Sequence, residues 1–463
     1  MAVVGVVVAL AASSGIPGTA AVGAQVTADE PQYLLTAGAL YHRQNLDIGP
    51  DLRAETWRVY HRADLPQQTA ALPGGQRLSP HDPLLPLILA FPFGLGGWVG
   101  AKLAMALMAG VLAALLVWTA VVRFRVPRGV AAVVVTAFGV VPPLVAYGSQ
   151  IYPELPAALA VTVAIAALTG RAGRRTTAVW VLAVTALPWL AVKYMPVALA
   201  LALVGVGVLH AARRPKLTVA AVGVLALSAV GFGVFHQAVY GGWTVYAVGN
   251  HFGGGELTVM GNAPDYLGRS QRLAGLLTDR DFGLLAWAPA FLAALPACGA
   301  LVRRRPPGWL ALGLPLGAGW LNATFVALTM HGWWWPGRQV VVVVPCIVLA
   351  IAWYLGTVVP STAKASAWSG WRLNLLVATA FGVMAWLGVQ VATAQATSTV
   401  IVDFARTANP VTRAWRILLP DLRTQGALDS VRTLVWLVVF AALTAWGWRQ
   451  AGPRSVRGGH EDA

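Results

Sequence analysis

Apolar residues in this chain fall in blocks of about 20, the length at which a helix crosses the hydrocarbon layer of a membrane. Only 11% of the 463 residues are charged, and 57% are hydrophobic. A water-soluble domain has roughly 25% charged residues, because polar side chains must cover its surface. This chain cannot cover a soluble body in that way, so we predict an all-α polytopic membrane protein.

The apolar blocks predict about twelve transmembrane helices. The stretch 84–96 is too short to cross the bilayer and contains Pro86 and Pro92, so we expect an interfacial or re-entrant helix that leads into the second span. Pro196 is expected to break the stretch 176–212 into two spans. The expected spans are 3–22, 97–122, 129–147, 153–170, 176–194, 195–212, 217–240, 282–302, 309–330, 339–357, 373–395 and 431–449.

Lysine and arginine in the short loops set the expected orientation, because cytoplasmic loops carry an excess of these residues. With the N-terminus inside, 17 basic residues fall on short cytoplasmic connections. Every Asp and Glu except Glu461 and Asp462 then falls on the outer side or at its membrane edge. We therefore expect a multi-pass protein of the plasma membrane with both termini in the cytoplasm. This topology explains much of the net charge of +16, so we do not expect a nucleic-acid partner.

One outer loop is much longer than any inner connection. Loop 23–83 holds seven carboxylates and five arginines, and long loops carry function more often than the spans they join. We expect a single transmembrane domain over 1–449, whose large first extracytoplasmic loop contains juxtamembrane helices and the catalytic motif. A short polar cytoplasmic tail follows at 450–463. The sequence shows no internal repeat, which weakens a transporter interpretation.

The sequence also bears on whether the N-terminus is cleaved and whether disulfide bonds form. Residues 3–22 could be mistaken for a signal peptide, but they lack a basic leading segment, and cleavage near Ala28 would leave Asp29 at the new terminus. We therefore favour a retained first helix, and the missing basic flank leaves open that the true start lies upstream. Cys298 and Cys346 both fall inside expected spans, so a disulfide framework is not expected.

The first candidate motif places two adjacent carboxylates, Asp29 and Glu30, directly after the first span and before Pro31. Two interpretations are open. Asp29 can cap a helix that starts at the proline, or it can act at the membrane edge as general base on a hydroxyl group. A second motif, His81 and Asp82, lies where the loop returns to the membrane. This pair can share a proton or bind a cation, or it can form the polar start of an apolar helix.

Further charged residues stand at the outer membrane edge, where a charge is costly unless it is paired or functional. Glu154 is the sole carboxylate between Asp82 and Glu256. Lys193 can pair with it or with a phosphate, although snorkelling to the interface explains a lone lysine equally well. Tryptophans at this depth are often an interfacial belt, but with His and Arg they can also hold a lipid phosphate. The remaining candidates are Arg280, Asp281, His331, Trp333, Trp334 and Arg338.

Taken together and in this order, the motifs resemble the GT-C superfamily of integral membrane glycosyltransferases. The resemblance is strongest to bacterial phospholipid-carrier-dependent enzymes related to protein O-mannosyltransferases and the lipid A aminoarabinose transferases, and it covers about residues 1–345. The motifs that carry it are Asp29-Glu30-Pro31 with Tyr33, His81-Asp82-Pro83, Tyr152-Pro153-Glu154, Pro188-Trp189 with Lys193-Tyr194, the stretch 279–285, and Trp333-Trp334 with Arg338.

The resemblance implies a GT-C fold and the transfer of a hexosyl or pentosyl group from a polyprenyl-phosphate donor to an acceptor hydroxyl outside the cytoplasm, usually with inversion. It implies Asp29 as the base, with Glu30 assisting it or binding the acceptor. The expected partners are the lipid-linked donor, membrane lipids, and a glycan, lipid or protein acceptor. The candidate donor-phosphate ligands are Lys193, Arg280, His331 and Arg338, and the other site candidates are His81, Asp82, Glu154, Asp281, Trp333 and Trp334.

No metal ion is assigned from the sequence. A divalent cation, if one is used, has Asp29, His81, Asp82 and Glu154 as its candidate ligands. The main alternative function is a transporter or flippase of lipid-linked saccharide precursors, which about twelve spans with both termini inside would suit. The scarcity of charge at mid-membrane depth argues against it. An inactive homologue acting as a scaffold is a third possibility, and the intact motifs argue against it.

Overall fold

The computed structural model describes residues 1–18, 26, 29–62, 64–249, 255–332, 334–362, 365–394 and 410–452 of the chain. In this part of the chain the regular structure is helical, and β pairing is limited to three isolated bridges. The all-α fold predicted from the sequence is therefore confirmed. The helices (α, with η for 3-10 and π segments) are α1 Ala2–Ser13, α2 Glu30–Arg43, α3 Gly49–Arg53, η1 Thr56–Val59, α4 Leu84–Val122, α5 Arg128–Gly139, α6 Leu144–Tyr147, α7 Glu154–Leu168, α8 Arg174–Leu190, η2 Val192–Tyr194, α9 Met195–Ala211, α10 Pro215–Tyr240, η3 Val245–Val248, η5 Glu256–Met260, α11 Tyr266–Arg269, α12 Arg272–Thr278, α13 Leu284–Trp287, η6 Pro289–Ala293, α14 Ala294–Arg304, α15 Trp309–Leu321, η7 Asn322–Val326, η8 Arg338–Val343, α16 Val344–Trp353, η9 Tyr354–Val358, α17 Val359–Thr362, α18 Ala365–Ala394, α19 Pro410–Arg416 and α20 Ala427–Ala451.

Seven helical segments of the described chain are long and apolar enough to cross a membrane, by length and composition. They support a polytopic membrane protein, but the expected count of twelve is not confirmed. Three of the expected spans are present as shorter apolar helices, α1, α5 and α7. Helix α5 ends at Gly139, shortly before Pro142 and Pro143, because proline has no N–H with which to continue the helix. The seven segments are Leu84–Val122, Val192–Ala211, Pro215–Val248, Trp309–Val326, Arg338–Val358, Gly370–Ala394 and Ala427–Ala451.

Two breaks between helical segments that the sequence predicted are present. Helix α4 leaves helical geometry at Gly96 and Gly97, where the second glycine adopts a φ of 58°. The stretch before this kink corresponds to the expected interfacial helix, and the stretch after it to the second span. Helix α8 ends at Leu190, and α9 begins at Met195, beside the expected break at Pro196.

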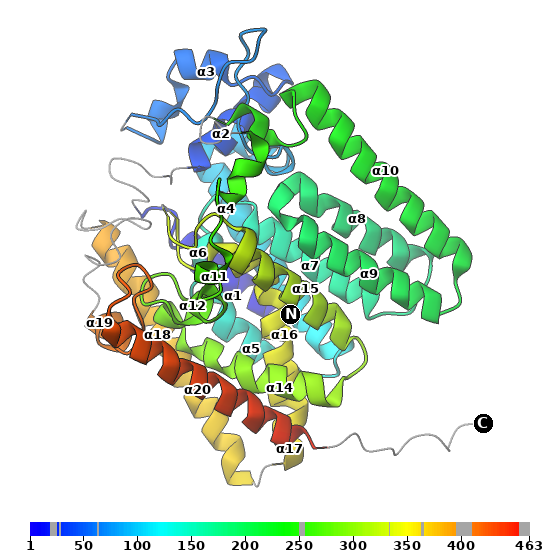
Figure 1. Cartoon of the computed structure of the whole chain (residues 1–463), viewed down its shortest axis with the longest axis vertical. Coiled ribbons are helices and arrows are strands. Elements are labelled where there is room, and N and C mark those ends of the chain that lie inside the picture. The colour runs from blue at the N-terminus through cyan, green and yellow to red at the C-terminus, as the bar shows by residue number, and fades with distance from the viewer. Residues whose placement is uncertain are drawn as a thin grey trace.

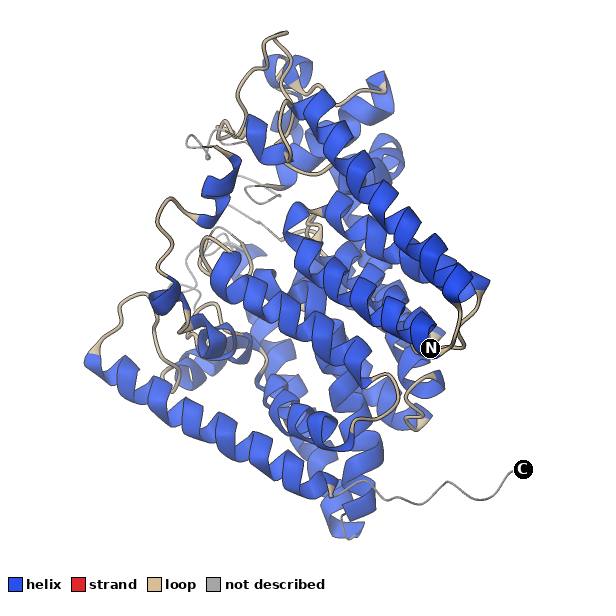
Figure 2. Ribbon diagram, turned by 45° about the vertical axis from the view of Figure 1, so that its right-hand side comes forward, coloured by secondary structure: helices blue, strands red, loops and turns tan. Residues whose placement is uncertain are grey.

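The helices divide into a buried centre and an apolar periphery. The segment of η8, α16 and η9 is the centre, since 94% of its most apolar window is buried. Helices α10 and α20 lie along opposite edges of the molecule in both views (Figures 1 and 2), and only 11% of the most apolar window of each is buried. Most of their exposed side chains are apolar, as expected of helices that face lipid.

Small residues let the helices approach closely, as is common in membranes, where packing rather than water drives association. A Cβ atom added to Gly110 of α4 would lie 2.6 Å from the carbonyl oxygen of Gly5 in α1. The same holds between α14 and α20, where a Cβ on Gly447 would lie 2.0 Å from the carbonyl oxygen of Pro296. These two contacts hold the first and last described helices against the bundle.

The first long loop lies at one end of the molecule. Helices α2 and α3 lie together at the top of Figure 1, beyond the main bundle, and α2 packs against α4. A small apolar cluster joins the loop to the end of α10 and consists of Leu78, Tyr240, Val245 and Val248. This packing brings the start of α2 over the ends of several spans.

Candidate active site

Four charged side chains from distant parts of the sequence meet in one cluster. The Arg338 guanidinium donates from Nη1 to Asp29 Oδ2 at 2.8 Å and from Nε to Glu154 Oε1 at 2.9 Å. Lys193 Nζ donates to the same Glu154 oxygen at 2.6 Å. We call Asp29, Glu154, Lys193 and Arg338 the charge cluster. Its two carboxylates and two cations balance, which makes their shared burial tolerable.

The ends of helices place these four groups. Asp29 is the N-cap residue of α2, Glu154 is the first residue of α7, and Arg338 is the first residue of η8. Lys193 lies in η2, the short turn that separates α8 from α9. A carboxylate at a helix N-terminus is favoured by the helix dipole. Asp29 occupies the capping position, yet its side chain makes no capping hydrogen bond and is directed at Arg338 instead.

Aromatic rings hold the Arg338 guanidinium from its faces. The centroid of the Tyr152 ring lies 4.3 Å from its carbon and that of Trp334 lies 5.0 Å away. A guanidinium stacked on rings keeps its N–H groups free for in-plane acceptors. The side chain of Glu154 is fully buried beneath it. Arg338 is therefore fixed in position while it contacts both carboxylates.

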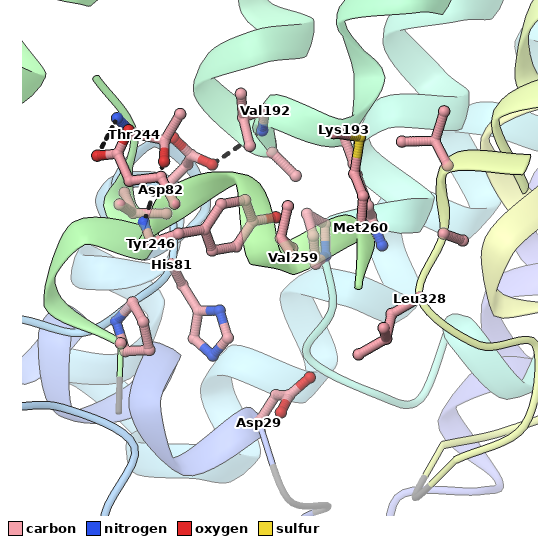
Figure 3. Close-up of a pocket in the computed structure, with 18 of the residues that line it drawn as sticks. Asp29, His81, Asp82, Val192, Lys193, Thr244, Tyr246, Val259, Met260 and Leu328 are labelled. Atoms are coloured by element: carbon pink, nitrogen blue, oxygen red, sulfur yellow. Dashed lines mark hydrogen bonds between the residues drawn. The ribbon is translucent and has the colours of Figure 1, made fainter. Parts of the chain in front are cut away.

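The charge cluster borders a cavity of about 670 Å³, which we call the central cavity. Figure 3 shows Asp29, His81 and Lys193 arranged around this space. The Trp334 and Arg338 side chains line it as well. The lining also includes large apolar side chains, among them Trp243, Val245, Val259, Met260, Val326 and Leu328.

Burial and neighbouring charge set the protonation of Asp29 and His81. Burial raises the pKa of Asp29, but its charged neighbours, above all the Arg338 guanidinium, outweigh burial and hold the pKa below the ordinary value of 3.8. Burial lowers the pKa of His81 to about 4. At neutral pH the site therefore presents an aspartate anion beside a neutral imidazole. The His81 ring stacks on Tyr33 with 4.5 Å between centroids.

Glu30 and Asp82 lie near the charge cluster but are engaged elsewhere. Glu30 Oε1 accepts from the Ile151 N–H at 2.7 Å and lies 3.7 Å from Lys102 Nζ, and both side chains of this ion pair are buried. Asp82 lines the central cavity, and its carboxylate accepts from the Val192 N–H at 2.9 Å. Glu30 therefore anchors the start of α2 to the bundle.

The predicted residues Arg280, Asp281 and His331 form a separate group and do not line the central cavity. Arg280 lies 3.8 Å from Asp421 and 4.0 Å from Asp429, and Asp281 pairs with Arg416. His331 Nε2 lies 3.3 Å from Asp279 Oδ2, beside a second hollow of about 580 Å³. These contacts tie the segment before α13 to the chain around α19. Trp333 lies outside the described residues.

The four candidate metal ligands do not form a single ligand set. Among the residues that the structure describes, no three His, Cys, Asp or Glu side chains stand close enough together to hold a metal ion. Asp29 and Glu154 are bridged by Arg338, and Asp82 turns its carboxylate to Val192.

Sequence reasoning missed three polar residues that support the site. Gln68 Nε2 lies 3.5 Å from Asp29 Oδ1, Asn322 donates to the Lys193 carbonyl at 3.1 Å, and His236 contacts Asp82 at 3.2 Å. Asn322 and His236 fall inside expected spans, where a polar side chain is itself a signal of function. Nothing in the sequence around Gln68 distinguishes it from other loop residues.

Comparison with known proteins gives a match at the level of fold. No family model and no curated protein matches this chain. Among solved structures, ArnT from Cupriavidus metallidurans in the apo state aligns over 96% of this chain and 75% of its own, with a TM-score of 0.51 at 14% identity. Likeness at this identity shows the overall fold.

Two further structures align less well. ArnT from Cupriavidus metallidurans bound to undecaprenyl phosphate gives a TM-score of 0.45 at 16% identity, over 97% of this chain and 76% of that one. The apo oligosaccharyltransferase of Archaeoglobus fulgidus gives 0.45 at 10% identity, over 86% of this chain and 56% of that one.

Proposed function

We propose that this chain, a polytopic membrane protein with the GT-C fold, is a glycosyltransferase. It moves a hexosyl or pentosyl group from a polyprenyl-phosphate donor to an acceptor hydroxyl on the extracytoplasmic side, with inversion. The observation that carries the proposal is the charge cluster at the edge of the central cavity. It combines a carboxylate able to take a proton with two cations able to hold a phosphate.

The reaction needs one proton acceptor and one anion site. The acceptor oxygen attacks the anomeric carbon of the sugar, and its proton passes to Asp29 as the new glycosidic bond forms. The bond between the anomeric carbon and the phosphate oxygen breaks, and the electron pair leaves with polyprenyl phosphate. Negative charge grows on that phosphate, and Arg338 and Lys193 stabilise it by charge-assisted hydrogen bonds. Attack opposite the leaving group inverts the anomeric centre.

Donor binding should also raise the pKa of Asp29. Without donor, Arg338 is shared between Asp29 and Glu154. A phosphate that takes the Nη groups of Arg338 competes with Asp29 for them, while the Nε contact to Glu154 can persist. Asp29 then becomes a stronger base, because it loses the cation that holds its pKa down. The arrangement favours binding of donor before the proton is taken.

The walls of the central cavity suit a lipid-linked donor. Several large apolar side chains of the wall are exposed, including Trp243 at 67% and Leu257 at 78%. An isoprenoid chain could lie against them, while its phosphate reaches Lys193 and Arg338. The same cavity adjoins the outer loop, in keeping with the expected extracytoplasmic position of the site. The sugar and the acceptor stay unassigned.

Replacement of Lys193 tests the phosphate site. Lys193→Met keeps the length of the side chain and removes its charge, so affinity for polyprenyl phosphate should fall by about tenfold or more. Titration calorimetry of the purified protein with polyprenyl phosphate measures this change. Lys216→Met, at the exposed start of α10, is the matched control and should bind as the unchanged protein does. Equal affinity for the Lys193 variant would place the phosphate elsewhere.

A further inference from the structure

A fully buried histidine stands on a helix that otherwise faces lipid. His236 lies near the outer end of α10, and its side chain is 0% exposed. The other buried residues of this helix are Ala221, Phe232 and Tyr240. An ionisable side chain in a membrane helix is costly unless it is paired or functional. Its position therefore calls for a role in the site that it faces.

Both nitrogens of the His236 ring face oxygen atoms. Nδ1 lies 2.8 Å from the Phe232 carbonyl oxygen, and Nε2 lies 3.2 Å from Asp82 Oδ1. A carbonyl can only accept, so Nδ1 carries a hydrogen. A further proton must then lie between Nε2 and the carboxylate, on one atom or the other. His236 and Asp82 are thus joined by a hydrogen bond in either protonation state.

The other oxygen of Asp82 contacts the residue next to Lys193 of the charge cluster. Oδ2 accepts from the Val192 N–H at 2.9 Å, a bond drawn in Figure 3. The next residue is Lys193, whose Nζ contacts Glu154 at 2.6 Å. His81, the residue before Asp82, lines the central cavity. One carboxylate therefore connects α10 to the turn that presents Lys193.

Aromatic rings enclose the histidine and fix its orientation. Phe232 and Tyr240 lie at centroid distances of 3.9 and 5.3 Å, and Phe235 and Trp189 lie at 5.4 and 5.8 Å. A hydrogen bond surrounded by rings in this way exchanges little with water, so it is stronger than one at a surface. This enclosure makes the pair a rigid support.

We propose that His236 and Asp82 are positioning residues for donor binding: they fix the 191–194 turn and so hold Lys193 where the donor phosphate binds. Neither residue contacts the reacting atoms in this scheme. The inference rests on the proposed function, because it assigns Lys193 to the donor phosphate. It adds His236 of α10, a residue that belongs to none of the sequence motifs, to the residues that support donor binding.

Steady-state kinetics of three variants on α10 test the proposal. His236→Phe fits among the surrounding rings but cannot bond Asp82, so the KM for the polyprenyl-phosphate sugar should rise roughly tenfold, with kcat changed much less. His236→Gln places an amide N–H near Asp82 and should restore a KM within about threefold of the unchanged protein. Gln237→Ala, on the exposed side of the same helix, is the control and should leave both constants unchanged.

The Asp82 carboxylate provides a second test, independent of whether His236→Phe folds. In Asp82→Asn the amide oxygen can accept from the Val192 N–H and the amide N–H can donate to His236 Nε2, so the donor KM should stay near that of the unchanged protein. Asp82→Ala removes both bonds and should raise the KM as His236→Phe does.

Two results would overturn the inference. The first is an unchanged donor KM in a folded His236→Phe protein, and the second is an equal rise in KM for His236→Phe and His236→Gln. A purely structural role would lower the yield of folded protein without changing the KM of the folded fraction. Failure of the proposed function has a different signature, because the unchanged protein itself would then transfer no sugar.

Discussion

At the scale of single residues, Arg338 governs the electrostatics of the site. It contacts Asp29 and Glu154 at once, while the rings of Tyr152 and Trp334 hold its faces. A lysine has one point charge and no planar fork, so it could not make both contacts in the same geometry. The pKa of Asp29 therefore depends on a residue more than 300 positions away in the chain.

Removing this guanidinium should shift the pH dependence of activity. Asp29 must be ionised to act as a base, so activity falls as the pH drops through its pKa. Burial raises that pKa, but Arg338 and the other charged neighbours together lower it further than burial raises it, so the acid limb of the unchanged protein lies below the ordinary aspartate range. In Arg338→Ala the largest lowering effect is lost and burial is opposed only by the smaller effects of the other charged neighbours, so the acid limb of kcat/KM should move to higher pH. Profiles of kcat/KM from pH 3 to 8 measure it.

The same variant should also lose activity at its best pH, by about 100-fold, because both a phosphate ligand and the partner of two carboxylates are gone. Arg175→Ala, at the exposed start of α8, is the control and should keep the original profile. An acid limb that stays in place in Arg338→Ala would show that Asp29 is not the titrating base.

The sequence predicted the residues of the charge cluster better than their partners. Glu154 and Lys193 were candidates because each is an isolated charge at the outer membrane edge, and such charges need partners. The pairing of Glu30 with Lys102 and of Asp82 with His236 was not predicted. Those pairs join separate helices across long stretches of sequence, and no local pattern encodes which spans become neighbours.

At the scale of helices, the sequence predicted where helices break but not where π segments form. The kink of α4 at Gly96 and Gly97 and the gap before α9 follow from glycine and proline chemistry. The π segments η7 and η9 carry no comparable signal. Tertiary packing satisfies their backbone groups, so local propensity does not reveal them. The apolar blocks predicted more long spans than the described chain contains because three of them, at 3–22, 129–147 and 153–170, hold the shorter helices α1, α5 and α7.

The contact between α1 and α4 allows a test at this scale. In Gly110→Ala the new Cβ would meet the Gly5 carbonyl oxygen at 2.6 Å, so the helices must separate, at a cost of about 1–3 kcal/mol. The thermal unfolding temperature of the purified protein in detergent should fall. Gly223→Ala in α10 is the matched control, since nothing lies within 4 Å of its added Cβ. If both variants unfold at the same temperature, close packing at Gly110 does not stabilise the bundle.

At the scale of the whole molecule, the distribution of charge predicts how the bundle is oriented in the membrane. The basic residues of the short loops and the carboxylates were assigned to opposite sides of the membrane from sequence alone. In the structure the charge cluster lies near the outer loop that forms one end of the molecule (Figure 1). The orientation of that end relative to the membrane can be measured directly.

Cysteine labelling should distinguish the two sides. In a background where Cys298 and Cys346 are replaced by alanine, Gly74→Cys in the exposed part of the long loop should react with a membrane-impermeant maleimide on intact cells. Arg171→Cys, in an expected cytoplasmic loop, should react only after permeabilisation. The reverse pattern would place the central cavity on the cytoplasmic side and contradict the proposed topology.

The most direct test of the central claim is sugar transfer by the Asp29→Asn protein. Asparagine keeps the size of the side chain and cannot take the acceptor proton, so release of polyprenyl phosphate from a polyprenyl-phosphate sugar should fall by about 100-fold or more. The measurement uses reconstituted vesicles that contain acceptor extracted with the native membranes, and donor binding to the variant serves as the folding control. Full release by a correctly folded Asp29→Asn protein would contradict the account.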